Sequence, residues 1–413
     1  LRIGDRFGVL TDGPRDAPER QRDLRSVFEW SFSLLDVNGQ RCLSELSVFS
    51  GSFDVAAAAA ALDKPVETAH GILGHFAQRS LLERERTGGA VTRFRMLESL
   101  KQFAAGRLAA TGDVEETRAR HARFYLDRVV TLDEQLTGPR QSEAFRELVA
   151  ESENVRSALA WSLRSGRHEL GVPLAARCGR FWDWRGSVAE ANRWYPRFID
   201  AEPVDTVPDL GLLWSWHAYF VLEAGDVDAA REISAHARAL SARRKDTLSA
   251  AAAASVGAVI ARHDGDVAIA IDLDAVARTL AGELGDRWLE AWADNHDALC
   301  FLASGDTEAA WAPARASLLT FEALGDQRGV GWATTVLATV SLQASDLAEA
   351  ASLSESAAEL TRRVGDGRNA AWAHEIAAAA AETAGEVARA ETFRGEAREL
   401  LIERGVPFSP WRR

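Results

Sequence analysis

The polar side chains best suited to chemistry are most concentrated at Asp294-Asn295-His296-Asp297. A carboxylate beside a histidine can act in general acid–base catalysis, but an α-helix turns by about 100° per residue and spreads these side chains around its surface. The nine histidines form no His-Glu-x-x-His pair, and the cysteines Cys42, Cys178 and Cys300 are far apart. The sequence therefore predicts no catalytic centre, metal site or cofactor site in this chain.

Aromatic side chains point instead to a surface for a ligand or partner. Trp214 and Trp216 lie about 200° apart on a helix, so at least one is expected to face a groove or solvent. Rings in a groove supply a large contact area at a small cost in conformational entropy. The candidate residues, called the aromatic surface below, are Trp214, Trp216, His217, Tyr219, Trp288, Trp292 and His296.

Two interpretations of the aromatic surface stay open. Trp292, Trp332 and Trp372 recur every 40 residues, which favours burial of these rings between repeats. If the other rings line a groove, neighbouring acids would favour a cationic or hydroxyl-rich partner over an anionic one. Those acids are Asp264, Asp294 and Asp297.

A repeat of 40 residues must position these side chains. Glycine ends a helix in the left-handed conformation, and the aspartate after it caps the next helix. Such pairs stand at Gly225-Asp226, Gly265-Asp266 and Gly305-Asp306, and continue as Ser345-Asp346 and Gly385-Glu386. Three columns of small residues keep the same step: Ala218, Ala258, Ala298, Ala338 and Ala378; Ala230, Ala270, Ala310, Ala350 and Ala390; Ala237, Ala277, Ser317, Ala357 and Ala397. Each repeat is therefore expected to hold two closely packed helices.

The predicted product is an α-solenoid over residues 151–405. First helices are expected over 209–224, 249–264, 287–304, 327–344 and 367–384, and second helices over 227–243, 267–282, 307–324, 347–364 and 387–404. A degenerate unit precedes them, marked by Gly179, Gly186, Ala191 and Phe198, and a helix is expected over 153–165. The small positions around the turn resemble those of the tetratricopeptide repeat, although that repeat is usually about 34 residues long.

The N-terminal part reads as helices followed by a β-hairpin. Helices are expected over 21–35, 38–48, 55–62, 66–79 and 97–110, and strands over 80–86 and 90–96, joined at Thr87-Gly88-Gly89. This order describes a winged helix over 21–112, with a helical linker over 113–150 and a tail over 406–413. The predicted fold class is mainly α, with one small hairpin.

Five stretches of the N-terminal part resemble one family of regulators. They are LRSVFEWSFSLL (24–35), LSELSVFSGSFDVAAAAAAL (43–62), FAQRSLLERE (76–85), FRMLESLKQFAAGRL (94–108) and RARHARFYL (118–126). In this order they resemble the actinobacterial STAND-type regulators, in which an NB-ARC-like nucleotide switch precedes a winged helix and a tetratricopeptide array. The resemblance implies a cytoplasmic sensor arm: the solenoid binds a ligand or protein, and the winged helix relays to an NTPase domain.

The same resemblance implies that the ATP site lies outside this chain. A P-loop reads GxxxxGK[ST], and none of the three lysines here follows a glycine. The chain begins at Leu1, so residues 1–20 are expected to be the end of the segment after the nucleotide domain. Met96-Leu97-Glu98 stands where relatives carry a Met-His-Asp triplet that contacts the nucleotide. Met96, Leu97 and Glu98 are expected to form a relay of the nucleotide switch; alternatively, Met96, Leu97 and Leu100 are helix core.

Charge argues against nucleic acid as the main partner. Residues 1–150 carry 21 Lys and Arg against 22 Asp and Glu, which leaves 27 of the 48 basic and 39 of the 61 acidic residues for 151–413. The net charges are therefore −1 and −12, without a basic face. The alternative function, a DNA-binding transcription regulator, would rest on Arg79, Arg84, Arg93 and Arg95. The isolated cysteines fit a reducing cytoplasm, and the apolar stretch 248–261 is too short to span a bilayer.

Overall fold

The computed structural model describes residues 19–85, 92–201 and 204–403. The chain divides into two compact units. Unit 1 comprises the residues up to 128 together with 149–171, and unit 2 comprises 129–148 and the residues from 172 onward. The predicted linker 113–150 is thus shared between the units. The predicted segment before residue 19, the turn at 87–89 and the tail at 406–413 lie outside the described residues.

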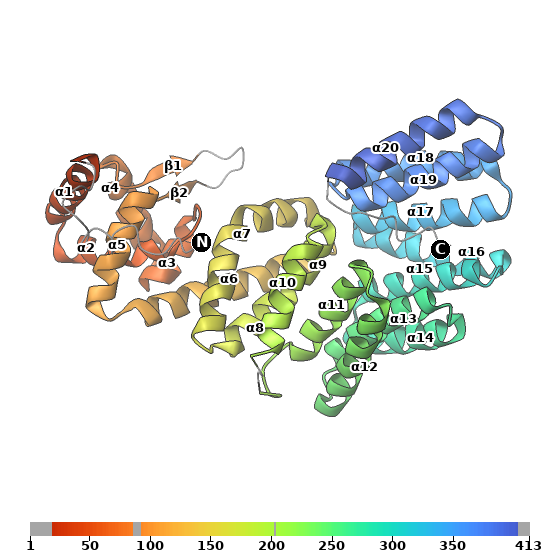
Figure 1. Cartoon of the computed structure of the whole chain (residues 1–413), viewed down its shortest axis with the longest axis horizontal. Helices are drawn as coiled ribbons and strands as arrows, with labels where there is room; N and C mark the ends of the chain where they lie inside the picture. The colour runs from red at the N-terminus through yellow and green to blue at the C-terminus, as the bar shows by residue number, and fades with distance from the viewer. Residues whose placement is uncertain (1–18, 86–91, 202–203, 404–413) are drawn as a thin grey trace. The chain divides into compact units, whose positions relative to one another are not determined.

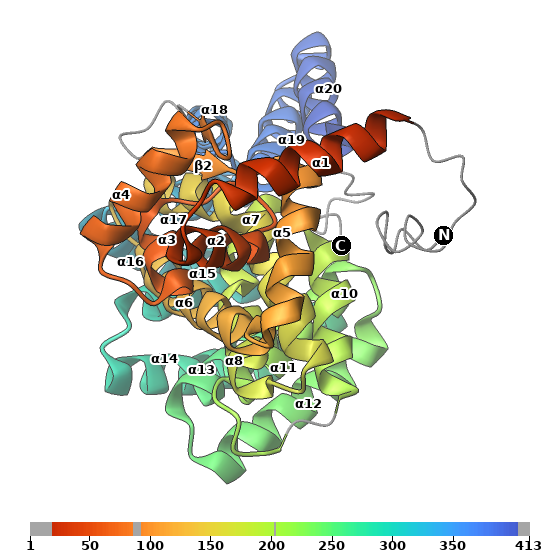
Figure 2. The same ribbon diagram turned by 90° about the vertical axis from the view of Figure 1, so that its left-hand side faces the viewer.

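Unit 1 begins with short helices and a hairpin, in the predicted order. Figure 2 shows the first helix along its length. The elements are α1 (Glu19–Ser33), α2 (Val37–Glu45), a 3-10 turn (Leu46–Val48), α3 (Val55–Leu62), α4 (Val66–Gln78), β1 (Glu83–Glu85), β2 (Arg93–Arg95) and α5 (Glu98–Thr111). Two long helices follow and contribute to both units: α6 (Val114–Gln135) and α7 (Gln141–Arg164).

The hairpin of unit 1 has a third contact that its sequence did not reveal. Strands β1 and β2 pair in an antiparallel register, with Arg84 opposite Phe94. Phe53, just before α3, exchanges two backbone hydrogen bonds of 2.8 Å with Phe94. Helix α3 then begins because Asp54 accepts a bond from the Ala57 amide at 2.8 Å. Helix α2, the bridge at Phe53, helices α3 and α4 and the hairpin thus follow one another along the chain.

The prediction of a helix starting at 153 is wrong, because α7 begins at Gln141. Asn154 does not open the helix: it is buried, and its side chain accepts bonds from the Ser50 and Gly51 amides at 2.9 and 3.2 Å. Glu151, one turn earlier, is also buried and binds Arg93 of β2 at 2.6 Å. Asn154 thus holds the segment 50–52, and Glu151 holds the hairpin of unit 1.

Unit 2 contains the predicted solenoid (Figure 1). A degenerate unit of α8 (His168–Arg177), α9 (Gly179–Arg185) and α10 (Val188–Ile199) comes first. Five repeats follow, whose first helices are α11 (Leu210–Glu223), α13 (Thr247–Asp264), α15 (Arg287–Ala303), α17 (Gln327–Gln343) and α19 (Gly367–Thr383). Their second helices are α12 (Val227–Arg244), α14 (Val267–Leu284), α16 (Thr307–Leu324), α18 (Leu347–Arg363) and α20 (Val387–Glu403). The predicted boundaries are confirmed to within two residues.

The turns and the small columns of the repeats behave as the 40-residue step predicts. Gly225, Gly265, Gly305 and Gly385 adopt φ between 82° and 93°, and Ser345 takes the same left-handed region with φ 64°. The aspartates after them accept bonds from backbone amides three residues on, except Asp266, whose side chain makes no such bond. Every residue of the three small columns is buried. Burial of the columns lets neighbouring helices pack at short distance.

Enlarging a buried column residue is expected to destabilise the solenoid. Ala338 of α17 is fully buried, so Ala338→Leu should force neighbours apart and cost about 1–3 kcal/mol of unfolding free energy. Urea unfolding followed by circular dichroism measures this loss. Ala388→Leu on the exposed side of α20 is the control and should leave the midpoint unchanged. Equal midpoints for Ala338→Leu and the wild type would contradict the packing described here.

Candidate ligand site inside the solenoid

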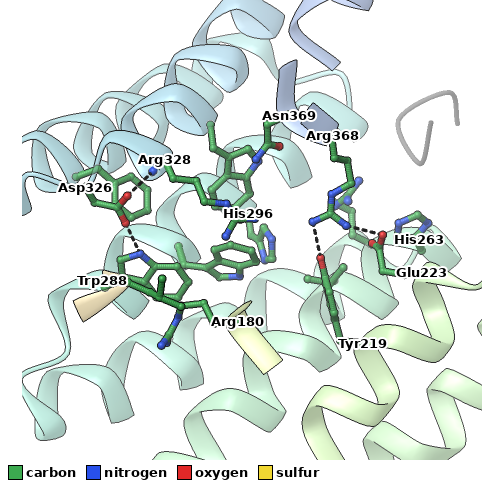
Figure 3. Close-up of a pocket in the computed structure, with 17 residues that line it drawn as sticks. Arg180, Tyr219, Glu223, His263, Trp288, His296, Asp326, Arg328, Arg368 and Asn369 are labelled. Carbon is green, nitrogen blue, oxygen red and sulfur yellow. Dashed lines mark hydrogen bonds and ion pairs between the residues drawn. The ribbon is translucent and has the colours of Figure 1, made fainter. Parts of the chain in front are cut away.

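The first helices of all five repeats line one space in unit 2. Two adjoining pockets share Arg180, Tyr219, Val259, Trp288, Trp292 and Arg328 as lining residues, and together they are called the inner pocket here. Arg180 comes from α9 of the degenerate unit, and the other five come from α11, α13, α15 and α17. Arg368 of α19 completes the lining (Figure 3). The solenoid therefore curls far enough for its first and fifth repeats to face the same space.

Most of the aromatic surface lines the inner pocket. Tyr219, Trp288, Trp292 and His296 lie on it, as does Trp216. The rings form a chain: Trp288 stacks on Trp292 at 5.2 Å between ring centres, and Trp292 lies 5.1 Å from His296. Trp288 and Trp292 are half-buried, whereas Tyr219 and His296 are buried. The wall of the pocket is thus aromatic, with partly exposed ring edges.

Trp214 and His217 lie elsewhere. The ring of Trp214 lies 4.2 Å from His236 of α12, and His217 is 6.3 Å from Tyr195 of α10. Trp216 faces the opposite way and covers Gly179, where a Cβ atom would meet its ring at 2.4 Å. The expectation that two tryptophans two positions apart cannot share one direction is met by this arrangement, and Gly179 is required beneath Trp216.

The acids expected to attract a cationic partner are used elsewhere. Asp294 and Asp297 both bind Arg278 of α14, and Asp264 binds Arg231 of α12 at 2.8 Å. The charged residues that line the two parts of the inner pocket are Arg177, Arg180, Arg262, His263, Arg328 and Arg368, together with the acids Asp133, Asp183, Glu223, Asp286 and Asp326. The three acids named from the sequence therefore bind arginines of neighbouring helices, and the predicted preference for a cationic or hydroxyl-rich partner stays a prediction.

A ladder of bonds joins the later repeats at the pocket. The indole nitrogen of Trp288 donates to Asp326 at 2.7 Å, and Nε of Arg328 donates to Asp366 at 2.6 Å. In both cases the donor stands two residues after its own capping aspartate, and the acceptor is the capping aspartate of the next repeat. Arg368 holds the same position in the fifth repeat. The step of 40 residues thus places a hydrogen-bond donor at the same position of the third, fourth and fifth repeats.

Arg368 turns across the pocket to the first repeat. Its guanidinium donates to Glu223 of α11 at 2.6 Å and to the hydroxyl oxygen of Tyr219 at 3.0 Å. Both bonds are drawn in Figure 3. Glu223 is four residues after Tyr219 on the same helix, and burial raises the pKa of its carboxyl despite the nearby Arg368. This ion pair closes the solenoid end to end.

Asp183 of α9 is the anion on which the two arginines converge. Arg328 donates to its Oδ2 atom at 2.7 Å, while Arg368 and the Tyr219 hydroxyl donate to Oδ1. The residue is 4% exposed. Burial alone would raise the pKa of Asp183, but the Arg368 and Arg328 guanidiniums outweigh it and lower the pKa to about 2. Asp183 is therefore ionised at neutral pH.

The segment 129–148 also packs on the pocket. Gln141, at the start of α7, donates to Asp326 at 2.9 Å and accepts from the backbone amide of Arg328 at 3.1 Å. Arg180 binds Asp133 of α6 at 2.6 Å and lies 4.7 Å above the ring of Trp288. Residues that precede the repeats thus bind side chains that line the inner pocket.

His296 has a buried carboxyl group, that of Asp274, as its neighbour on α14. Asp274 of α14 is fully buried, and its Oδ1 atom lies 3.8 Å from Nδ1 of His296. Neither carboxylate oxygen of Asp274 has a hydrogen-bond partner among the described residues. Burial raises the pKa of Asp274 to about 8 and lowers the pKa of His296 to about 3. At pH 7 both side chains are uncharged.

Sequence reasoning missed the charged residues of the pocket. Trp288, Arg328 and Arg368 form a column with a step of 40 in the sequence, but only the tryptophan stands out by its residue type. Asp183 carries no comparable signal, because it belongs to the degenerate unit. Glu223 and Arg368 are 145 residues apart, and their contact depends on the curvature of the whole array.

The proposed relay residues of unit 1 are divided between core and surface. Met96 and Leu100 are buried, as a role in the helix core requires. Leu97 is 46% exposed and precedes α5, so the expectation that it belongs to the core is wrong. Glu98 is exposed in the first turn of α5.

The four arginines considered for DNA contact do not form one free surface. Arg93 is 5% exposed, and binds Glu151 and Ser52, so it cannot reach a phosphate. Arg95 pairs with Glu85 on the neighbouring strand. Arg84 lies 5.9 Å from the ring of Phe94, and Arg79 donates to the Leu34 carbonyl at 3.5 Å. Arg93 is thus a structural residue of the hairpin.

Two general properties complete the description. No helix within the described ranges is long and apolar enough to cross a membrane. Over the same residues, no three His, Cys, Asp or Glu side chains gather as ligands of a metal ion. The three cysteines are buried free thiols.

Comparison with known proteins gives distant relatives. No protein-family model matches the sequence. A candidate HTH-type transcriptional regulator of Mycobacterium tuberculosis is 27% identical over 241 residues, which cover 55% of this chain and 27% of that protein. An uncharacterised protein of the same organism is 29% identical over 126 residues, or 29% of this chain and 32% of its own length. This chain thus spans about a quarter to a third of the curated relatives it matches.

A solved structure shares the fold. It is a Signal Transduction ATPase with Numerous Domains (STAND) protein with a tetratricopeptide repeat sensor, from Pyrococcus horikoshii. The TM-score is 0.54 at 16% identity, over 94% of this chain and 60% of that one. The mainly α fold with a repeat solenoid is confirmed.

Proposed function

We propose that this chain is the sensor arm of a cytoplasmic STAND-type regulator of transcription. Unit 2 binds a small ligand or a protein in the inner pocket, and unit 1, as a winged helix, relays the change to an NTPase domain in the same polypeptide. The observation that carries the proposal is the inner pocket itself. A buried, charged and aromatic space shared by all five repeats is more than a scaffold needs, since buried charges are costly unless they serve a purpose.

Two facts support the STAND assignment. The stretches of residues 24–126 resemble that family in order, and the structure with the same fold is a STAND protein with a tetratricopeptide repeat sensor. The relatives named as HTH-type regulators support a role in transcription. Coupling between the pocket and a nucleotide domain would be allostery between two distinct sites.

The proposal is tested by ATP hydrolysis in the longer protein that carries this chain. Trp216→Ala removes a ring from the inner pocket. It should change the hydrolysis rate severalfold, because it alters the pocket through which the sensor is proposed to act. Trp214→Ala is the matched control, since that ring packs on the opposite side against His236. If both variants fold and hydrolyse ATP at the wild-type rate, the solenoid does not regulate the nucleotide domain.

The chain alone is expected neither to bind nor to hydrolyse ATP. It has no P-loop, and Leu97 stands at the position where relatives carry a phosphate-contacting histidine. Isothermal titration with ATP-Mg and with ADP should show no saturable heat at micromolar ligand. Saturable binding would place a nucleotide site in this chain and contradict the division of roles proposed here.

Direct binding of DNA is the second candidate function, favoured by the names of the relatives. We expect the chain not to bind random duplex at about 150 mM salt, since phosphate contacts supply most non-specific affinity and residues 1–150 carry a net charge of −1. Fluorescence anisotropy measures this. Tight binding that is lost in an Arg84→Ala, Arg95→Ala double variant would promote this function to first place. Arg93 is unsuitable for the test because it is buried.

A further inference from the structure

Two arginines from successive repeats meet at one buried carboxylate in the inner pocket. The side chains of Arg328 and Arg368 are 10% and 12% exposed, and each donates to a different oxygen of Asp183. The hydroxyl of Tyr219 adds a third donor at 2.8 Å. Three donors around two oxygens is the arrangement that recognises any carboxylate or phosphate group.

We propose that Arg328, Arg368 and Tyr219 form a binding site for the carboxylate or phosphate group of a small ligand, and that Asp183 occupies this site in the ligand-free protein. The ligand displaces Asp183 and loosens α9 from the repeats. This inference rests on the proposed sensor function and names the chemistry of its ligand.

Charge favours an anion in this place. The two guanidiniums are already buried away from water, so their electrostatic attraction for a ligand anion that replaces Asp183 is only weakly screened. Without Asp183 the arginines would retain Asp366 and Glu223 as partners, and burial raises the pKa of Glu223. When Asp183 leaves, each guanidinium and the Tyr219 hydroxyl lose one acceptor, and a ligand anion can take its place.

The position of Asp183 allows exchange with a ligand. It lines one part of the inner pocket, Arg368 lines the other part, and Arg328 lines both. The ion pairs thus stand between two spaces, and the body of a ligand has the half-buried rings of Trp216 and Trp288 to pack against.

Helix α9 is the element that would respond. It has seven residues, and Gly186 ends it in the left-handed conformation with φ 71°. Its bonds to the repeats include those of Asp183 and that of the Trp184 indole, which donates to the Val364 carbonyl at 3.2 Å. Displacement of Asp183 breaks its ion pairs with Arg328 of α17 and Arg368 of α19.

Anion rescue tests the site. In Asp183→Ala the arginines face an empty carboxylate position, so inorganic phosphate or formate should bind there and stabilise the fold. A ligand at ten times its dissociation constant raises the folding equilibrium constant about 11-fold. Thermal melts over a concentration series of each anion, at ionic strength fixed with chloride, should show a saturating rise for Asp183→Ala. Comparing the two anions tells phosphate from carboxylate preference.

Matched variants separate binding from general salt effects, because phosphate stabilises most proteins by exclusion from their surface. Asp297→Ala removes an arginine-paired acid outside the inner pocket and should show no saturating rise. Adding Arg368→Gln to Asp183→Ala should abolish the rescue. If Asp183→Ala does not fold, Asp183→Asn removes the charge at nearly constant volume and takes its place. Equal responses in the Asp183 and Asp297 variants would overturn the anion site.

Displacement is measured in the wild-type chain by amide hydrogen exchange. Saturating phosphate or formate should speed exchange in α9 severalfold while exchange in α13 stays constant. Anion binding without faster exchange in α9 would overturn the displacement. If rescue fails while Trp216→Ala still alters ATP hydrolysis in the longer protein, the anion site is wrong and the sensor function stands. Rescue without any effect of Trp216→Ala would refute the sensor function alone.

Discussion

Replacing Arg328 by alanine is expected to lower the unfolding free energy of unit 2 by about 3–5 kcal/mol, the usual cost of leaving buried charges without their partner. Arg328 is 8% exposed and bridges Asp183 of α9 and Asp366 of α19 with bonds of 2.7 and 2.6 Å. Its loss leaves both carboxylates buried and without the positive charge of this guanidinium. Urea unfolding followed by circular dichroism measures the loss.

Two further variants define the origin of this loss. Arg231→Ala also removes an arginine that pairs with aspartates, but on the surface, and should leave the midpoint unchanged. The double variant Arg328→Ala, Asp183→Ala should lose less than the sum of the two single losses, because it removes both members of one pair. Additive losses would show that the bond between these residues contributes nothing to stability.

Asp274→Asn is expected to change how stability depends on pH. The pKa of Asp274 is about 8 in the fold, mainly because of burial, against about 3.9 in an unfolded chain. Between these values the native state holds a proton that the unfolded state has released. The contribution of this group to stability is therefore complete below pH 4, and is lost as pH rises toward 8.

Asparagine does not ionise, so the variant should become more stable relative to the wild type as pH rises. The unfolding equilibrium constants should diverge by roughly tenfold per pH unit between pH 5 and pH 8. Other charged groups near Asp274 are present in both proteins and cancel in the comparison; they are Arg278 on its own helix, Arg262 of α13, and Asp294 of α15. Asp272→Asn, exposed on the same helix, is the control and should show parallel profiles. A parallel profile for Asp274→Asn would mean that Asp274 is ionised in the fold.

The repeats could be predicted from the sequence because their determinants are local. A left-handed glycine followed by a capping aspartate needs only a few residues of context, and Ala298 or Ala338 repeats at a fixed distance from it. The hairpin of unit 1 was predicted for the same reason. The start of α7 was not, because Asn154 resembles a cap in isolation and is buried by contacts with Ser50 and Gly51, about 100 residues away.

The aromatic half of the candidate site was predictable, and the charged half was not. Trp288 and Trp292 stand out by type and spacing. The choice of an anion rather than a cation depends on where Asp294 and Asp297 point, and they bind Arg278 of the preceding helix. It also depends on Asp183, which meets Arg328 and Arg368 only after the array has curled.

The bond between Arg368 and Glu223 has a consequence for how such an array can evolve. Open solenoids gain and lose whole units by duplication and deletion, since each unit contacts only its neighbours. Here the fifth repeat grips the first, across 145 residues, so the copy number is fixed by the geometry of closure. Deleting or duplicating one 40-residue unit would leave every helix intact and still part the two ends. Descendants of this protein can therefore change the pocket by substituting residues, but not by changing the number of repeats.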